Sequence, residues 1–134
     1  MKCINSIFAL ALLAGAFVST AVGDELDDAL SKVATWTSND EPAPLQEIEE
    51  AVVDALNGKL DRGSLEQKLI TALQASSTRR SRSFLCRQLR IVGTDACVPV
   101  LTDVLTNPES SHMVRYVLGS MKTPAARAAL IGSL

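Results

Sequence analysis

The C-terminal part of the chain repeats itself with a period of 29 residues, and this repeat limits the fold more than any other feature. Shifting the segment from Phe84 onwards by 29 residues places apolar positions on apolar positions and one helix-capping position on another: Phe84 on Met113, Leu89 on Leu118, Val92 on Met121, Thr94 on Thr123, Ala96 on Ala125, Leu101 on Leu130 and Leu105 on Leu134. Two unrelated amphipathic segments would share the apolar stripe but rarely the cap. A period of 20 to 50 residues with two helices per unit is typical of an α-solenoid. We therefore expect an all-α fold of stacked antiparallel helix pairs, with 45–75 as a diverged third unit.

Apolar residues recur at helical spacing along the chain from 24 onwards, and sustained alternation typical of strands is missing from the sequence. Each stripe predicts the inward face of a short helix. The expected inward residues are Leu26, Leu30 and Val33; Leu45, Ile48, Val52 and Leu56; Leu65, Leu69 and Leu73; Leu85, Leu89 and Val92; Val98, Leu101, Val104 and Leu105; Val114, Val117, Leu118 and Met121; and Ala126, Leu130 and Leu134.

Capping residues and prolines predict where these helices begin. The expected starts are Pro44, Ser64 with Gln67 as a capping box, Thr78, Thr94 or Asp95, Asn107-Pro108-Glu109, and Thr123-Pro124. Asn57-Gly58 and Gly93 are expected to end the helices before them.

The N-terminal segment 1–23 has the composition of a secretory signal. Lys2 supplies a positive start, twelve apolar residues follow over 7–18, and small residues end the segment. A membrane-spanning helix needs about 20 apolar residues. We therefore expect an exported protein, periplasmic or secreted, that is cleaved after Gly23 or after Ala21 and has no membrane contact once the signal is removed. An uncleaved anchor is the alternative interpretation.

Charge is distributed unevenly over a chain whose formal net charge is only −2. Residues 24–54 include ten acidic residues and one basic residue, whereas 55–134 include eleven basic and five acidic residues. We expect a signal segment over 1–23, an acidic N-terminal helix and linker over 24–43, and a repeat domain over 44–134. The two halves could attract each other or bind separate partners. The overall acidity and the expected export argue against nucleic acid as a partner.

Two cysteines, Cys86 and Cys97, follow the expected signal segment. An exported protein can oxidise such a pair. On antiparallel helices that turn at Gly93, the two residues would be offset by about 6 Å along the helix axes, which are about 8–10 Å apart. This separation exceeds the Cα distance of about 7 Å that a disulfide tolerates. We favour two buried thiols, with a disulfide as the alternative.

The segment Phe84–Leu105 (FLCRQLRIVGTDACVPVLTDVL) resembles a HEAT repeat. An apolar and basic first helix is followed by a turn at Gly93 and by a second helix that begins Val98-Pro99-Val100-Leu101. The short unit is similar to the HEAT-like repeats of phycobilin lyases, and the pattern FLCRQLR, VPVL and SHMVRYVL is similar to exported bacterial HEAT-repeat proteins of uncharacterised role. The resemblance covers 78–134 and implies an armadillo-like helical fold, but it is nearly silent on function.

Two departures from the repeat pattern bear on partners. Ala128 stands where Pro99 would recur, and Leu134 lies inside a repeat without a polar capping helix after it. Solenoids usually need capped ends. We expect either a fragment of a longer array or an end that docks on something, including another copy of the chain.

Five arginines form the strongest candidate for a partner-binding surface. At 100° per residue they fall within an arc of about 160°, opposite the apolar stripe of the same helix. They are Arg79, Arg80, Arg82, Arg87 and Arg90. This strip could dock an acidic partner or the acidic N-terminal helix. A solvated helix face without a partner is the alternative interpretation.

Other chemistry-bearing residues predict neither catalysis nor a metal site. His112 and Ser111 are adjacent on a helix and so do not face each other, and no nucleophile-elbow motif surrounds the serine. A zinc site needs three or four ligands at recognisable spacing, and the single histidine and two cysteines do not match one. Trp36 could dock the first helix or serve as an exposed anchor.

These patterns favour a non-catalytic, protein-binding scaffold without a cofactor. Its concave surface would be lined by the second helices of the units, including Thr102 and Asp103. The alternatives are a lyase-like enzyme acting on a bound chromophore, suggested only by the resemblance, and a truncated fragment of a longer repeat array.

Overall fold

The computed structural model describes residues 23–133, and these fold entirely into helices, turns and loops without a strand. An N-terminal helix, described over 23–34, precedes α2 (Ala43–Leu56), α3 (Arg62–Ala75) and α4 (Arg79–Val92). The short 3-10 helix η1 (Asp95–Cys97) leads into α5 (Val98–Leu105), followed by α6 (Ser111–Met121) and α7 (Pro124–Gly132). The predicted all-α class is confirmed. The expected signal segment, except Gly23, and the expected inward position of Leu134 lie outside the described residues.

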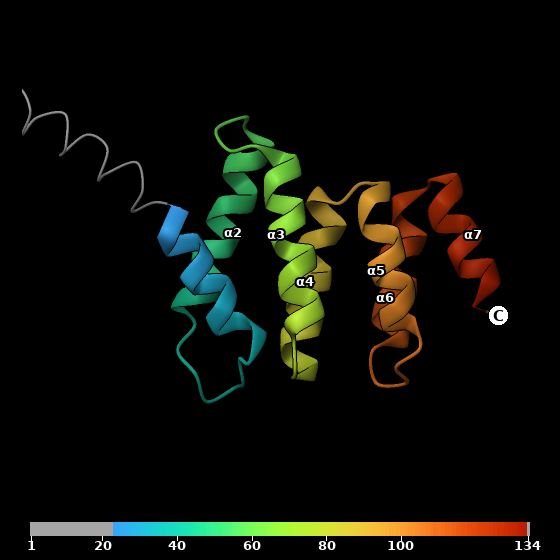
Figure 1. Ribbon diagram of the computed structural model, residues 1–134, viewed down its shortest axis with the longest axis horizontal. Coiled ribbons are helices and arrows are strands. Elements are labelled where there is room, and N and C mark those ends of the chain that lie inside the picture. The colour runs from blue at the N-terminus through green and yellow to red at the C-terminus, as the bar shows by residue number, and fades with distance from the viewer. Residues whose placement is uncertain (1–22, 134) are drawn as a thin grey trace, which may run out of the picture.

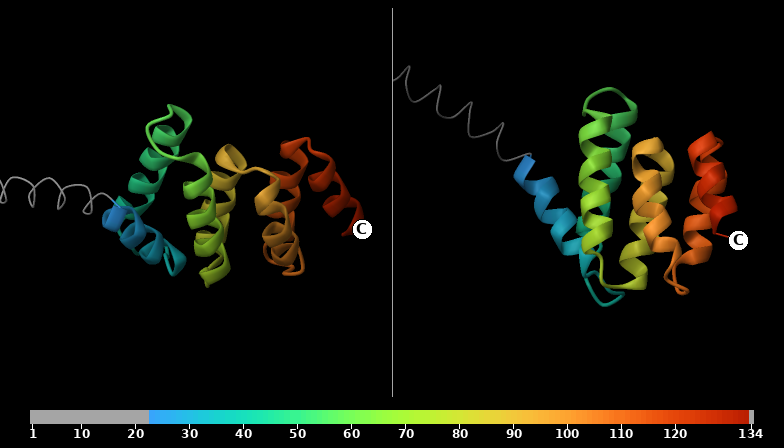
Figure 2. Two further views of the ribbon diagram at one scale, coloured as in Figure 1. Left: turned by 45° about the horizontal axis from the view of Figure 1, so that its top comes forward. Right: turned by 45° about the vertical axis from the view of Figure 1, so that its right-hand side comes forward.

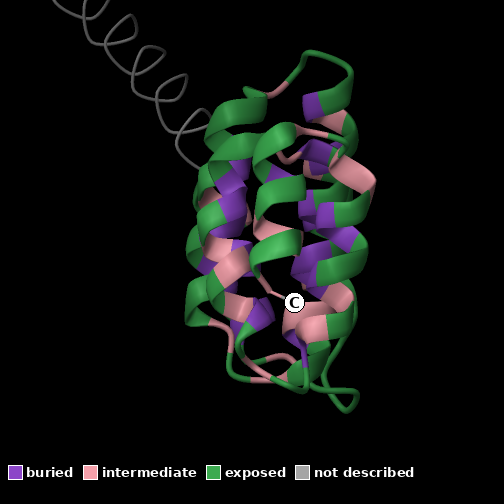
Figure 3. Cartoon of the chain, turned by 90° about the vertical axis from the view of Figure 1, so that its right-hand side faces the viewer, coloured by how far each residue is buried: buried purple, intermediate pink, exposed green. Residues whose placement is uncertain are grey.

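The helices form two layers (Figures 1 and 2). One layer contains α2, α4 and α6, with α4 packed against both of the others. The second layer contains the N-terminal helix, α3, α5 and α7, and successive helices alternate between the layers. Viewed along the row of helices, buried segments face the space between the layers and exposed segments face outwards (Figure 3). Among residues 23–133, no helix is long and apolar enough to cross a membrane.

The core follows most of the predicted stripes. The inward residues of α3 and α4 are buried as expected, as are Val98, Leu101 and Leu105 of α5 and Val114, Val117 and Leu118 of α6. Val104, Met121 and Leu130 are partly buried and pack at the edge of the core. The prediction for Leu56 is wrong, because its side chain is 54% exposed and Ala55 takes the inward position instead. Ile48, Val52 and Ala55 share one helix face, and Leu56 lies about 100° away from Ala55.

The N-terminal helix belongs to the same core as the helices that follow. Ala29, Leu30 and Val33 are buried in one cluster with residues of α2 to α7. The backbone N–H of Ser77 donates to the carbonyl of Ala34 at 2.9 Å, which joins the end of this helix to the segment before α4. The acidic N-terminal part of the chain is therefore packed onto the body and is not a separate arm.

Two predicted helix starts are confirmed by capping hydrogen bonds, one is shifted and two are wrong. The side chains of Thr78 and Thr123 accept a backbone N–H in the first turn of α4 and of α7. Thr94 caps η1, whereas α5 begins at Val98 after Cys97, which makes no side-chain capping bond. Asp61, not Ser64, caps α3, because its carboxylate accepts the Ser64 N–H at 2.8 Å. The sixth helix does not start at Asn107: residues 107–110 form a turn and α6 begins at Ser111.

Polar side chains of α3 join this helix to the end of α4 and to the start of η1. Arg62 of α3 donates from Nε to the carbonyl of Val92, 2.9 Å away, at the end of α4. Glu66 of α3 is only 3% exposed, and its carboxylate accepts the N–H of Thr94 at 2.7 Å and the Thr94 hydroxyl at 3.0 Å. These bonds join α3 to the corner between α4 and η1.

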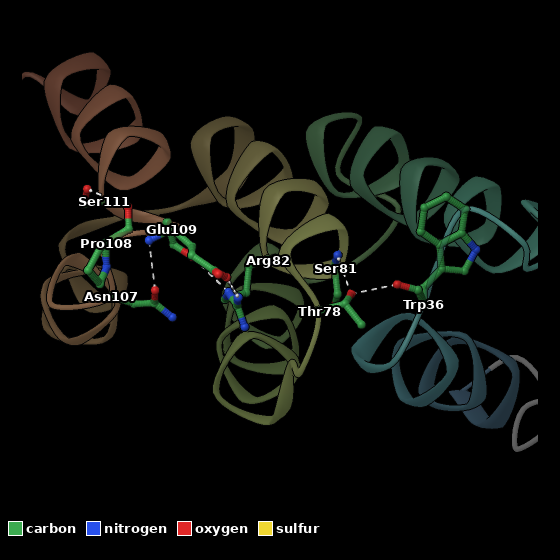
Figure 4. A network of polar contacts seen from close by, with 9 residues as sticks. Trp36, Thr78, Ser81, Arg82, Asn107, Pro108, Glu109 and Ser111 are labelled. Carbon is green, nitrogen blue, oxygen red and sulfur yellow. Dashed lines mark hydrogen bonds and ion pairs between the residues drawn. The ribbon is translucent and has the colours of Figure 1, made fainter.

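A second group of polar contacts joins α4 to the segments on either side of it (Figure 4). The hydroxyl of Thr78 donates to the carbonyl of Trp36 at 2.7 Å. Arg82 donates from Nε to the buried hydroxyl of Ser110 at 2.9 Å and lies 3.6 Å from the carboxylate of Glu109. The start of α4 is therefore anchored both to the preceding loop and to the turn before α6.

Candidate interaction surface

Four of the five predicted arginines share the outer surface of α4. Arg79, Arg80, Arg87 and Arg90 are exposed, whereas Leu85 and Leu89 on the opposite side are fully buried. The amphipathic pattern forces this arrangement, because burying the apolar stripe turns the arginines towards water. Arg82 differs from the rest: its side chain is only 13% exposed and is held by Ser110 and Glu109. It joins neighbouring helices and is not part of the outer strip.

An aromatic residue on α6 extends the arginine surface. The guanidinium carbon of Arg90 lies 4.6 Å from the centroid of the Tyr116 ring, within the range of a cation–π contact. Tyr116 is 60% exposed although it is a large, mostly apolar side chain. We call Arg79, Arg80, Arg87, Arg90 and Tyr116 together the basic face. It covers two neighbouring helices of one layer.

Within residues 23–133, no ion pair neutralises the charges of the basic face. The ion pairs among residues 23–133 join Lys32 to Asp28, Lys68 to Asp27 and Arg82 to Glu109. None involves the four arginines of the basic face, and arginine stays protonated at any ordinary pH. On the other side of α4, the exposed residues of α2 include Glu47, Glu49 and Glu50. The layer thus presents an acidic helix beside a basic one.

Tyr116 was not among the surface residues predicted from the sequence, because only the inward stripe of the sixth helix was predicted. One signal for it exists: the 29-residue period places Tyr116 on Arg87, an outward position of α4. Around the helix axis, Tyr116 also lies about 100° or more away from the inward residues Val114, Val117 and Leu118, which predicts that it points outwards.

The remaining candidate residues are not brought together into a reactive site. His112 is exposed, and the hydroxyl of Ser111 donates to the Pro108 carbonyl at 3.4 Å (Figure 4). Thr102 donates to Val98 within its own helix, and Asp103 is exposed. Over residues 23–133, no three His, Cys, Asp or Glu side chains are grouped so that they could hold a metal ion.

Trp36 is half-buried beside the loop that joins the N-terminal helix to α2. Its indole N–H donates to the carbonyl of Glu41 at 3.1 Å, and its own carbonyl accepts from Thr78. Both polar ends of the residue are used within the fold. This arrangement favours docking of the N-terminal helix over an exposed anchor for a partner.

Cys86 and Cys97 are both buried and unbridged. Burial raises the pKa of each thiol from about 9 to about 11, since a thiolate would lose its hydration in the core. The nearby Cys97 adds to the rise at Cys86, and Glu66 adds to the rise at Cys97. Nucleophilic cysteines need the opposite shift. These two residues act as small apolar side chains.

Several hollows lie at the N-terminal end of the molecule, and two of them are lined in part by α3. A groove of about 590 Å³ runs between the N-terminal helix and α3 and is lined mostly by small side chains, including Ala34, Ala72 and Ala75. A second hollow, of about 400 Å³, is lined by Leu26 and Leu60 among several acidic residues.

The surface that stands out is therefore the basic face, on which charge and an exposed aromatic ring coincide. Comparison with protein-family models, with curated proteins and with solved structures gives no match for this chain, so its function has to be argued from its own surfaces.

Proposed function

We propose that this chain is an exported, non-catalytic scaffold of stacked HEAT-like helix pairs, and that its basic face binds an acidic segment of a partner protein. One observation carries the proposal: four exposed arginines lie with Tyr116 on adjacent helices and share no ion pair with any described residue. Charge left unpaired on a folded surface is available to a partner of opposite sign.

The spacing of the polar links between segments that follow α2 supports the solenoid part of the proposal, whereas the links to the N-terminal helix and to Trp36 span 41–43 residues. Arg62 bonds to Val92, 30 residues away, while Glu66 bonds to Thr94 and Arg82 to Ser110, each 28 residues away. Long-range polar bonds that recur at about the period of the sequence repeat are expected when each unit contacts only its neighbours.

The chemistry of the basic face favours a carboxylate-bearing segment. The arginine fork matches carboxylates with two parallel hydrogen bonds, and Tyr116 offers an apolar surface for the stem of a bound side chain. The strip from Arg79 to Arg90 extends about 16 Å along α4, which suits a short extended or helical segment. The glutamates of α2 would repel the same segment and so confine it to α4 and α6.

The test is binding of a labelled decapeptide of glutamate to the purified protein by fluorescence anisotropy. The double variant Arg87→Glu/Arg90→Glu should weaken binding about tenfold or more, because two attractive contacts of about 0.2–1 kcal/mol each become repulsive. Lys32→Glu is the control: it also reverses an exposed basic side chain, but one on the N-terminal helix. Tyr116→Ala should weaken binding about two- to fivefold.

The affinity should also fall as salt rises, since added ions shorten the range of surface charge interactions from about 10 Å at 0.1 M to about 3 Å at 1 M. Equal loss of binding in the control and in the double variant would show that only net charge matters and would contradict the proposal. A single-stranded oligonucleotide that binds more tightly than the peptide would contradict it too.

A further inference from the structure

The outer side of α7 presents an exposed apolar stripe next to basic residues. Ile131 is 63% exposed, the most exposed of the large hydrophobic side chains among the described residues. It shares a shallow hollow of about 310 Å³ with Pro124 and Ala128 on the same helix, and Lys122, Thr123 and Arg127 complete its lining. Positions 124, 128 and 131 recur at helical spacing, so these residues form one continuous side of α7.

The 29-residue register shows how this end differs from the interior of the molecule. Val98 of α5 is only 7% exposed. The equivalent residue of α7 is Arg127, which is exposed. No acidic residue occurs anywhere in the sequence after Glu109. The side of α7 therefore carries positive charge where the inner unit carries a buried valine, and it suits an acidic neighbour better than a purely apolar one.

The opposite end of the molecule has the complementary character. The hollow of about 400 Å³ between the N-terminal helix, α2 and the start of α3 has apolar residues and four acidic side chains in its lining: Leu26, Ala51, Leu60, Glu25, Glu47, Glu50 and Asp54. Two lysines also line it, Lys59 and Lys68, of which Lys68 is paired with Asp27. We call this the acidic hollow. It offers an apolar floor and a surplus of negative charge.

We propose that two copies of the chain associate head to tail, with Ile131 of one copy in the acidic hollow of the next and Arg127 facing Glu47 and Glu50 there. The two surfaces differ and lie at opposite ends, so the contact is heterologous and each bound copy still presents a free end. The α7 side is only about 13 Å long, which makes the contact smaller than the roughly 1,200 Å² of a stable interface. The association is therefore weak and concentration-dependent. It uses a surface separate from the basic face.

The test is sedimentation equilibrium of the protein purified from an exporting host, with its N-terminus read by mass spectrometry. Over protein concentrations from about 10 µM to about 1 mM, the weight-average mass should rise steadily past that of a dimer, as an open contact requires. Raising the salt from about 0.05 M to about 0.5 M should lower the average mass, because the contact depends on charge.

Four variants identify the contact. Ile131→Asp should abolish association, while Ile91→Asp, a matched change at a residue of α4 that is 46% exposed, should not. Arg127→Glu and Glu50→Arg should each weaken association about tenfold, and the two changes combined in one chain should restore it to within about threefold. All of these side chains are exposed, so the fold should be kept.

A mass that stays monomeric up to 1 mM, one that levels off at a dimer, or one that Ile131→Asp leaves unchanged would overturn the head-to-tail contact. Failure of the double charge reversal to restore association would overturn it as well. Peptide binding through Arg87 and Arg90 should be unaffected by Ile131→Asp, so that failure of this inference can be told apart from failure of the proposed function.

Discussion

Replacing Glu66 by alanine is expected to lower the free energy of unfolding by about 2 kcal/mol. Glu66 is 3% exposed and its carboxylate accepts both the N–H and the hydroxyl of Thr94. Hydrogen bonds to a charged group contribute about 1.5–3 kcal/mol each. Thr94 is exposed, so water can replace part of what its two donors lose, and removing a buried carboxylate also recovers a desolvation cost. The two hydrogen bonds together contribute roughly 4 kcal/mol, and these two offsets leave a net loss of about 2 kcal/mol.

The assay is urea unfolding followed by the helical circular dichroism signal, with thermal unfolding in parallel. At about 2.1 cal/mol/K of unfolding entropy per residue, a loss of 2 kcal/mol lowers Tm by about 8 °C for a domain of this size. Glu66→Gln keeps the shape and one acceptor, and should lose about half as much. The control is Gln67→Ala, an exposed change on the same helix, which should lie within about 0.5 kcal/mol of the original protein.

Two outcomes would refute this reasoning. The first is a loss below about 0.5 kcal/mol for Glu66→Ala, which would mean that the corner between α4 and η1 is held by apolar packing alone. The second is additivity of Glu66→Ala with Thr94→Ala, because residues that share a hydrogen bond should show a coupling energy of at least about 0.5 kcal/mol.

Two further predictions concern glycines and thiols. Gly93→Ala should destabilise the protein by about 1–3 kcal/mol, because the new Cβ would clash with the backbone oxygen of Leu89. Gly119→Ala meets open space and should stabilise α6 by about 0.5–1 kcal/mol. Urea unfolding of both variants measures these changes. A change in unfolding free energy of the same sign for both variants would contradict the contact geometry. Because burial raises the thiol pKa of Cys86 and Cys97 to about 11, the unfolded chain ionises first as the pH rises. Their contribution to stability should therefore be constant below about pH 9, fall between pH 9 and 11, and level off above. The difference in unfolding free energy from a Cys86→Ala/Cys97→Ala variant, measured at each pH, isolates this effect, and a difference that is flat from pH 8 to 11 would argue against buried thiols.

Helix positions and the inward stripes could be predicted from the sequence because burial imposes a period of 3.6 residues on each helix. Capping by Thr78 and Thr123 could also be predicted, since a capping side chain bonds to the first turn of the helix that it precedes. Asp61 was missed because Ser64 and Gln67 offer a capping box three residues further on, and the sequence does not show which start tertiary packing favours. Asn107 and Pro108 are typical of helix starts, but here they form the turn that precedes α6.

The features of the candidate surface that could not be predicted from the sequence also depend on tertiary packing. The arc of five arginines was correct as helix geometry, yet Arg82 is held by Ser110 and Glu109, which belong to the turn before the next helix. Likewise, nothing in the sequence distinguishes Glu66 from a surface glutamate, and only the structure shows that it accepts from Thr94 at the start of η1. Contacts between segments 28 residues apart depend on how the helices pack against one another, and the period of one helix does not contain this information.

The helices after α4 are shorter than α2, α3 and α4, and we expect local stability to differ accordingly. Each of α2, α3 and α4 has 14 residues, whereas α5 has 8, α6 has 11 and α7 has 9. Ala126 is the one buried residue of α7, while α3 and α4 bury six and seven residues. Backbone amide protons of α7 should therefore exchange with solvent through fraying, and those of α3 and α4 only through global opening. Anything that covers α7 would lengthen the cooperative part of the chain, so occupancy of that end can be read from the exchange rates of amides that touch no partner.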